Sequence, residues 1–268
     1  MKLFRKSLTL CLLIFVMSAC SQTPKVLVLY YSQCGTTKAV AENIQQLTGA
    51  DIVSIDVTEP YDGTYEETIQ RCIKEREGGL VPELAPLDAD LSKYDLIFLG
   101  YPVWFGTYAP HVAALLNAVD LSGKTIVPFC TFGSGGLLSS IADLEANLPG
   151  CEIREGYGVR AARLEAVPDE VERFLILGGY IEGTVEPVED YGEMQPVTEE
   201  QAAIFEAATS GYMFPLGTAV ECASRVAPWG TDYKFIAEGQ SPRGDVSRST
   251  ILVTVAEGKD PEFTQVIR

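Results

Sequence analysis

Hydrophobic positions between residues 25 and 180 form short, nearly unbroken apolar runs separated by helical patterns. The runs are KVLVLYY, DIVSIDV, YDLIFLG, KTIVPFCT and REGYGV. Unbroken runs of this kind are typical of strands that are buried on both faces of a sheet. Between the runs, apolar residues recur at helical spacing, as at Val40, Ile44 and Leu47 and at Val171, Phe174 and Leu175. Five strands that alternate with helices predict an α/β fold with an open parallel sheet.

The chain after residue 180 changes in composition. Residues 181–196, IEGTVEPVEDYGEMQP, carry five acidic residues, no basic residue, two prolines and two glycines, which is typical of a linker. The stretch TEEQAAIFEAATSG then predicts a helix with a capping box formed by Thr198 and Gln201. It is followed by the strand patterns GTAVECASRV, TDYKFIAEG, STILVTVAEG and EFTQVIR. One helix followed by antiparallel strands predicts a second, small α+β domain over residues 197–268.

Residues 1–24 have the pattern of an export signal and a tether. Basic residues among the first six precede an apolar run, residues 8–16, that is too short to span a bilayer. The run ends in MSAC, which resembles the lipobox of bacterial lipoproteins, whose cysteine receives a lipid after cleavage. The resemblance implies a lipoprotein of the bacterial cell envelope, outside the cytoplasm, held to a membrane through Cys20. An ordinary signal peptide in which Cys20 is incidental is the alternative.

The charge and the cysteines of the chain limit the classes of partner and of site that fit it. The chain has 20 Lys+Arg against 37 Asp+Glu, a net charge of −17, which argues against nucleic acid as a partner. Dense acidic charge can also serve solubility alone. The five cysteines after Cys20 include no C-x-x-C pair, so the sequence shows no metal or redox motif. In an exported protein a bridge such as Cys72–Cys151 is compatible with the sequence, but nothing local selects the partners.

The joint between the first strand and the first helix, SQCGTT at residues 32–37, combines hydroxyl groups with a glycine. In a parallel α/β sheet such a joint lies at the carboxyl edge, where ligands bind. The start of the helix offers unpaired N–H groups and a positive dipole end, and Ser32, Thr36 and Thr37 add hydroxyls. Gly35 lets the backbone approach a ligand closely. The joint therefore predicts a phosphate site, although it is neither a Walker loop nor a G-x-G-x-x-G turn.

Three stretches together resemble the flavodoxin family. LYYSQCGTTKAVAENI resembles the flavodoxin signature, and FLGYPVWFGTYAP and FCTFGSGG resemble the second and third cofactor loops, in the same order. The similarity covers about residues 25–180 and departs from a GYPxWWGT second loop only at Phe105. It implies a flavodoxin-like domain, a five-stranded parallel sheet of strand order 2-1-3-4-5, and FMN as the cofactor.

The resemblance assigns the cofactor contacts to three groups of residues. It implies that the phosphate is held by Ser32, Gln33, Gly35, Thr36 and Thr37. It implies that one side of the isoalloxazine ring is lined by Pro102, Val103, Trp104, Phe105 and Gly106. It implies that the other side is lined by Thr131, Phe132, Gly133, Ser134 and Gly135. A flat conjugated ring suits aromatic partners and backbone amides.

Structural interpretations of the same residues stay open. Trp104 and Phe105 could pack the sheet edge, and GSGG at residues 133–136 could be a flexible turn. We expect Trp104 to lie on a loop. We expect the only histidine, His111, to be a surface or capping residue, because no carboxylate stands at a telling spacing from it.

The C-terminal part has a second resemblance. TEEQAAIFEAA, RVAPWGTDYKFIAEG and STILVTVAEG are similar to cystatins and cystatin-like domains, in which an antiparallel sheet wraps one helix. Cystatins inhibit papain-type proteases through a Gln-x-Val-x-Gly hairpin tip, and here the tip reads Val226, Ala227, Pro228, Trp229 and Gly230. The glutamine and the central valine are missing. The resemblance thus implies a cystatin-like fold with a docking or folding-partner role in place of inhibition.

These patterns favour an exported, lipid-anchored FMN flavoprotein that carries electrons or reduces a small acceptor, with an unidentified redox partner. A one-electron carrier and a nicotinamide-dependent reductase both fit the sequence. The alternative is a non-catalytic module with a vestigial flavin site, whose cystatin-like domain binds another protein. FMN supply outside the cytoplasm is the difficulty for the first hypothesis, because DVSRST at Asp245 does not fit the pattern at which flavin transferases attach FMN.

Overall fold

The computed structural model describes residues 24–240 and 244–267. The predicted export signal and Cys20 lie outside the described residues. Among the helices of the described part, none is both long and apolar enough to cross a membrane.

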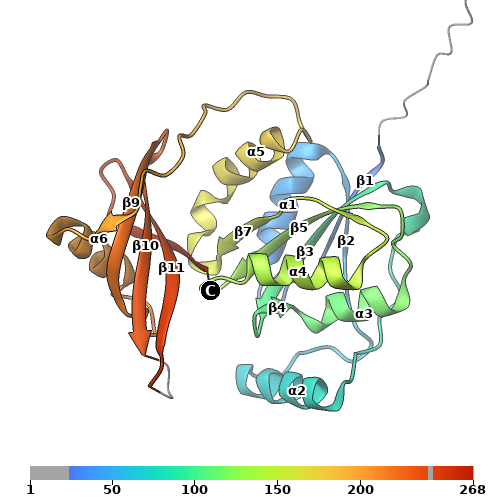
Figure 1. The fold of residues 1–268 in the computed structure, drawn as a ribbon. Coiled ribbons are helices and arrows are strands. Elements are labelled where there is room, and N and C mark those ends of the chain that lie inside the picture. Colours follow the sequence, from blue (N-terminus) through green and yellow to red (C-terminus); the bar gives the residue numbers. More distant parts are fainter. Residues whose placement is uncertain (1–23, 241–243, 268) are drawn as a thin grey trace, which may run out of the picture.

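The first domain is built on a parallel sheet, the blue, green and yellow-green part of Figure 1. Its strands are β1 (Val26–Tyr30), β2 (Asp51–Ser54), β3 (Leu96–Trp104), β5 (Thr125–Phe132), β6 (Glu152–Ile153) and β7 (Tyr157–Arg160). They are ordered β2-β1-β3-β5, with β6 and β7 both pairing with β5. Counted over the five predicted strands, this is the order 2-1-3-4-5, so that prediction is confirmed. The fifth predicted strand, residues 154–159, corresponds to β7, which begins three residues later, and the short strand β6 lies just before the predicted range.

Alternating residues of the central strands pack on two different helical layers. Leu27 and Leu29 lie in the same buried cluster as α3 (Pro110–Ala118) and α4 (Leu137–Asn147). Val28 lies in the cluster of α1 (Thr36–Thr48) and α5 (Val167–Leu177) on the other face. Helix α2 (Tyr65–Gly78) packs beside α3 through Cys72 and Ala114. Because helices cover both faces of the sheet, its strands read as unbroken apolar runs in the sequence.

The second domain is an antiparallel sheet with one helix, the orange and red part of Figure 1. Its strands are β8 (Gln195–Pro196), β9 (Thr218–Ala227), β10 (Gly230–Gln240), β11 (Val246–Ala256) and β12 (Glu262–Ile267), in the order β12-β11-β10-β9-β8. Helix α6 (Glu199–Thr209) packs on the sheet through Phe205, whose ring centroid lies 5.3 Å from that of Phe235. The predicted capping box is confirmed, since Thr198 and Gln201 exchange side-chain to backbone hydrogen bonds of 3.0 and 3.2 Å.

The segment between the domains differs slightly from the predicted linker. Residues 181–194 form no helix or strand, and they cross the top of Figure 1 from α5 to the second domain. The last two residues of the predicted linker form β8, which pairs with β9. The second sheet therefore begins within the last two residues of the predicted linker.

The five cysteines of the described residues are all free thiols. Cys72 lies on the buried side of α2, whereas the Cys151 thiol donates a hydrogen bond of 3.0 Å to the Leu121 carbonyl. A Cys72–Cys151 bridge is therefore not formed, and hydrophobic packing holds the described part of the chain together without disulfides.

Candidate functional site

The three predicted cofactor loops meet at the carboxyl edge of the parallel sheet. We name them the phosphate loop (residues 32–37), the second loop (102–106) and the third loop (131–135). The Thr131 hydroxyl lies 2.8 Å from the Thr37 hydroxyl and 3.3 Å from that of Thr36, and these contacts join the phosphate loop to the third loop. Just after the third loop, the Ser139 hydroxyl donates to the Gly106 carbonyl at 2.6 Å, which joins it to the second loop. The structure thus brings the predicted groups together.

The phosphate loop ends in a helix start that has no partner for its positive end. Helix α1 begins at Thr36 after Gly35, whose φ of 89° is left-handed, and no side chain caps it and no acidic residue stands in its first turn. Nothing lies within 4 Å of the position that a Cβ on Gly35 would take. The Ser32 hydroxyl is buried and has no hydrogen-bond partner. A phosphate group would supply the missing acceptor for these donors.

Gln33 differs from the other phosphate-loop residues. Its side-chain Nε2 donates to the Tyr61 carbonyl at 2.5 Å, and its Oε1 accepts a hydrogen bond from the Tyr31 hydroxyl. The side chain is therefore committed to the loop that follows β2, and only its backbone N–H is left for an anion. The sequence gives no sign of this, because Tyr61 lies 28 residues away.

The second loop is a tight hairpin. Trp104 is the last residue of β3 and pairs with Thr107 of β4 (Thr107–Tyr108). Phe105 and Gly106 form the turn with positive φ angles of 52° and 84°, as a two-residue hairpin turn requires. The expectation that Trp104 lies on a loop is therefore wrong. In this turn Phe105 adopts a left-handed backbone conformation, which is uncommon for residues other than glycine.

The two aromatic residues of this hairpin have different surroundings. The half-buried Trp104 indole meets the rings of Tyr31 and Tyr61 edge-on, at centroid distances of 5.9 and 5.8 Å. The Phe105 ring is 47% exposed, with the Arg76 guanidinium 5.1 Å from its centre. Trp104 thus supports the hairpin from within an aromatic cluster, while Phe105 is the more exposed of the two and the better placed to meet a flat ligand.

His111 is buried, so its expected place at the surface is wrong. Its ring stacks on Tyr31 at 3.3 Å between centroids and 10° between planes, and its Nδ1 has no hydrogen-bond partner. Burial, helped by the positive charge of Arg71, lowers the pKa of His111 to about 3. The reason is that α3 begins at Pro110 and places the next residue inward, against the strand that precedes the phosphate loop.

The third loop is held by residues outside the three predicted groups. Arg160, the last residue of β7, donates through Nε to the Gly133 carbonyl at 2.8 Å. The Val266 N–H of β12 donates to the Ser134 carbonyl at 2.6 Å. Neither residue is among the site residues predicted from the sequence. The position of Arg160 in the sequence could have predicted its place at the site, because it directly follows the fifth predicted strand and so belongs to the same edge of the sheet.

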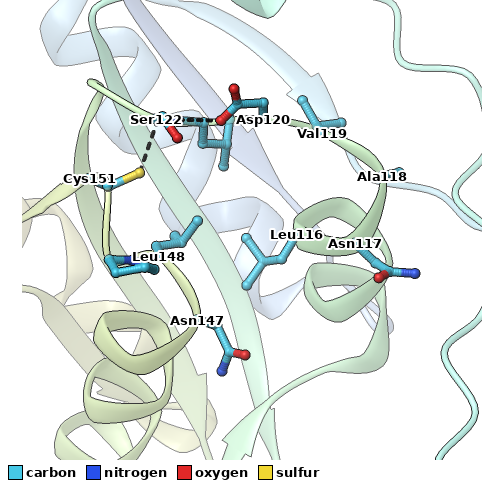
Figure 2. A pocket seen from close by; sticks show the side chains of 12 residues that line it. Leu116, Asn117, Ala118, Val119, Asp120, Ser122, Asn147, Leu148 and Cys151 are labelled. Carbon is cyan, nitrogen blue, oxygen red and sulfur yellow. Dashed lines mark hydrogen bonds between the residues drawn. The ribbon is translucent and has the colours of Figure 1, made fainter.

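Two cavities bear on the location of the site. One of about 280 Å³ lies between the second loop, the third loop and β12, and Gly106, Ser134, Gly135, Ser139, Gln265 and Val266 are among its lining residues. A larger one of about 370 Å³ lies between the ends of α3 and α4 and is shown in Figure 2. In it, Asp120 accepts a hydrogen bond from the Ser122 N–H at 2.9 Å. Helix carboxyl ends repel phosphate, so the second cavity does not extend the site.

Comparisons with known proteins agree with this geometry. The profile of a family described as Flavodoxin matches residues 25–172. A curated relative, the NAD(P)H dehydrogenase (quinone) of Cupriavidus metallidurans, is 31% identical over 135 residues, which are 46% of this chain and 65% of that protein. The chain thus covers less than two thirds of that relative's length.

Solved structures are also similar to the first domain. A flavoprotein from Bacteroides uniformis is 25% identical with a TM-score of 0.50, and the match covers 56% of this chain and 99% of that one. A flavoprotein from Lactobacillus acidophilus, solved in complex with FMN, is 25% identical with a TM-score of 0.47 and covers 56% and 98%.

The burial of His111 predicts a pH dependence of stability. The unfolded imidazole takes up a proton near its ordinary pKa of about 6.5, whereas the folded one stays neutral down to about 3, so stability is lost as the pH falls below about 6.5. Between pH 7.5 and 5.5, urea unfolding of the untagged protein should show a loss of about 1.4 kcal/mol. His111→Phe, which keeps a ring against Tyr31, should remove this loss, because the chain has no other histidine. An equal loss in the variant would contradict the assignment.

Proposed function

The chain belongs to the flavodoxin family and its cofactor is FMN; from this premise we propose that it is an exported, lipid-anchored redox protein that passes electrons from FMN to a small acceptor. The single observation that carries the FMN-binding part of this proposal is the buried Ser32 hydroxyl without a partner beside the uncapped start of α1. Export and the lipid anchor rest on the sequence of residues 1–24. A buried hydroxyl left unpaired costs about 1–3 kcal/mol, and a phosphate acceptor removes that cost.

The residues present fit FMN in three ways. Ser32, the N–H groups at the start of α1 and the open space at Gly35 suit its phosphate. The exposed ring of Phe105 suits one face of the isoalloxazine, and the backbone of the third loop suits its polar edge. When bound, FMN supplies one-electron and hydride chemistry, while the protein binds and orients it and sets its potential.

Reduction of an uncharged acceptor is the favoured form of this activity. All residues that line the cavity of about 280 Å³ beside the second and third loops are uncharged, and they offer hydroxyl, amide and apolar groups. That lining suits a small carbonyl-bearing ring such as a quinone. The Cupriavidus relative, named as a quinone dehydrogenase that uses NAD(P)H, supports the same acceptor class and a nicotinamide as the reductant.

The C-terminal domain fits a docking role better than protease inhibition. We propose a cystatin-like fold for it, since one helix packs on an antiparallel sheet. Its β9–β10 hairpin tip is engaged within the chain, because Trp229 donates to Asp232 at 2.9 Å and its ring lies 5.2 Å from the Arg173 guanidinium of α5. If an added papain-type protease bound to the chain through Trp229, the docking role would be contradicted.

A redox experiment separates the candidate activities. The purified chain is loaded with FMN, mixed anaerobically with NADH or NADPH, and then with a benzoquinone. A reductase loses the visible flavin absorbance with the nicotinamide and regains it with the quinone. A carrier responds only to a chemical reductant such as dithionite. If the chain retains no FMN, the loops are vestigial and the alternative of a protein-binding module stands.

Replacing Ser32 tests whether its unpaired hydroxyl binds the phosphate of FMN. Ser32→Ala should weaken FMN binding by about 1–3 kcal/mol, because a hydrogen bond to the charged phosphate is lost. The melting temperature of the FMN-free protein should stay the same or rise, because the hydroxyl has no partner to lose. Ser210→Ala, at the exposed end of α6, is the matched control. Unchanged FMN affinity in Ser32→Ala, measured by fluorescence titration, would overturn the phosphate-loop assignment.

The anchor is tested by fractionation of cells. Cys20→Ala should keep its signal segment or move to the soluble fraction, because the acyl chains have no thiol to join. Cys11→Ala, within the apolar run, should stay at the membrane. A correctly cleaved Cys20→Ala protein that remains membrane-bound would show that another feature holds it.

A further inference from the structure

The third loop has little of its own to fix its conformation. Residues 133–136 read GSGG, and glycine loses more backbone freedom on ordering than any other residue. The segment is held by contacts from outside. One is the packing of Gly136 on Val103, where an added Cβ would come within 2.5 Å of a side-chain carbon. The others come from Arg160 and from β12.

Strand β12 of the C-terminal domain lies directly on this loop. The Val266 N–H donates to the Ser134 carbonyl at 2.6 Å. At Gly135 the approach is so close that an added Cβ would lie 2.1 Å from the Val266 carbonyl oxygen, so only glycine fits there. In Figure 1 the dark red end of the chain reaches the α/β domain beside the start of α4. The edge of the second sheet is thus covered by the loop predicted to line the flavin.

Arg160 joins the loop and the strand through one guanidinium. Its Nε donates to the Gly133 carbonyl and its Nη1 to the Phe263 carbonyl of β12, both at 2.8 Å. The same guanidinium lies 4.1 Å from the centre of the Phe263 ring. A planar fork with donors in fixed directions holds two carbonyls in one defined geometry, whereas the three donors of a lysine rotate about a single atom and fix no such geometry.

An ion pair between the buried Arg163 and the half-exposed Glu262 fastens the same interface a few residues away. Arg163, 9% exposed, lies 2.9 Å from the Glu170 carboxylate of its own domain and 2.9 Å from the Glu262 carboxylate of β12. A buried cation needs its carboxylates, so removal of one of them weakens the docking of β12. Glu262 acts at this interface through Arg163, outside the three loops.

We propose that β12 is a built-in part of the flavin site and that Arg160 is its positioning residue. Docked β12 holds the third loop in the conformation that receives FMN, so FMN affinity depends on the C-terminal domain. This inference rests on the proposed function, in which the loops bind FMN. Because coupling between two binding events is reciprocal, FMN must in turn stabilise the docking of β12.

The cavity of about 280 Å³ supports the same assignment. Gly106, Ser134 and Gly135 form part of its wall, and Gln265, Val266 and Ile267 of β12 form another part. The C-terminal domain thus shapes the space next to the cofactor loops as well as holding one of them.

The test uses the full chain and four variants in FMN fluorescence titrations. Arg160→Gln removes the bridge, Arg160→Lys keeps the charge without the fork, and Glu262→Gln weakens the docking without touching a loop. Glu238→Gln, which changes an exposed ion pair with Arg248 in the same sheet, is the matched control. The first three should raise the FMN dissociation constant about fivefold or more, as expected for coupled sites, and Glu238→Gln should leave it within about twofold.

Hydrogen exchange of the wild type gives a measurement that does not depend on the variants. FMN should slow amide exchange in residues 262–267, and most clearly at Val266. If the wild type binds FMN, either of two results would overturn the inference. One is that FMN leaves amide exchange in this strand unchanged, and the other is that Arg160→Gln and Glu262→Gln bind FMN as tightly as the wild type. If Arg160→Lys bound FMN as tightly as the wild type, the positive charge alone would be sufficient, and the positioning role of Arg160 would be overturned. A wild type that binds no FMN would overturn the proposed function as well, which separates the two failures.

Discussion

The parallel register of β1, β3 and β5 is the constraint on which the site depends. Tyr30 pairs with Gly100, and Pro102 pairs with Thr131, so these neighbouring strands end at one edge of the sheet. Thr36 and Thr37 of the phosphate loop, which precede Thr131 by 95 and 94 residues in the sequence, are thereby brought within reach of the Thr131 hydroxyl. The phosphate loop can then leave its donors unpaired, because the sheet and not the loop carries the stability of the region.

Much of the α/β domain could be predicted because its signals are local. Apolar runs gave the strands, and the joint at residues 32–37 showed its hydroxyls and glycine directly. The errors concern tertiary contacts. His111 is buried because Tyr31 covers it, and Trp104 ends a strand because Phe105 and Gly106 turn the chain back on itself. The fastening of Arg160 to Phe263 joins residues 103 positions apart, which no local pattern reveals.

Two arginines lie where the third loop of the first domain meets β12 of the second. The chain is strongly acidic, and negative charge disfavours the addition of electrons to a bound flavin. Arg160 and Arg163 are the cations gathered at the third loop and at β12, where they are paired with carbonyls and carboxylates. Both arginines belong to the first domain, and β12 of the C-terminal domain holds them next to the cofactor loops through the Phe263 carbonyl and the Glu262 carboxylate. The C-terminal domain adds one backbone donor, the Val266 N–H.

A comparison of FMN with riboflavin, which has the same ring but no phosphate, tests most directly whether residues 32–37 bind the phosphate. Both are titrated into the purified wild-type chain, and binding is followed by flavin fluorescence. FMN should bind at least about tenfold more tightly, because each hydrogen bond to a charged group contributes about 1.5–3 kcal/mol. Equal affinities for the two flavins would contradict this prediction, because the donors of the phosphate loop would then have no part in binding.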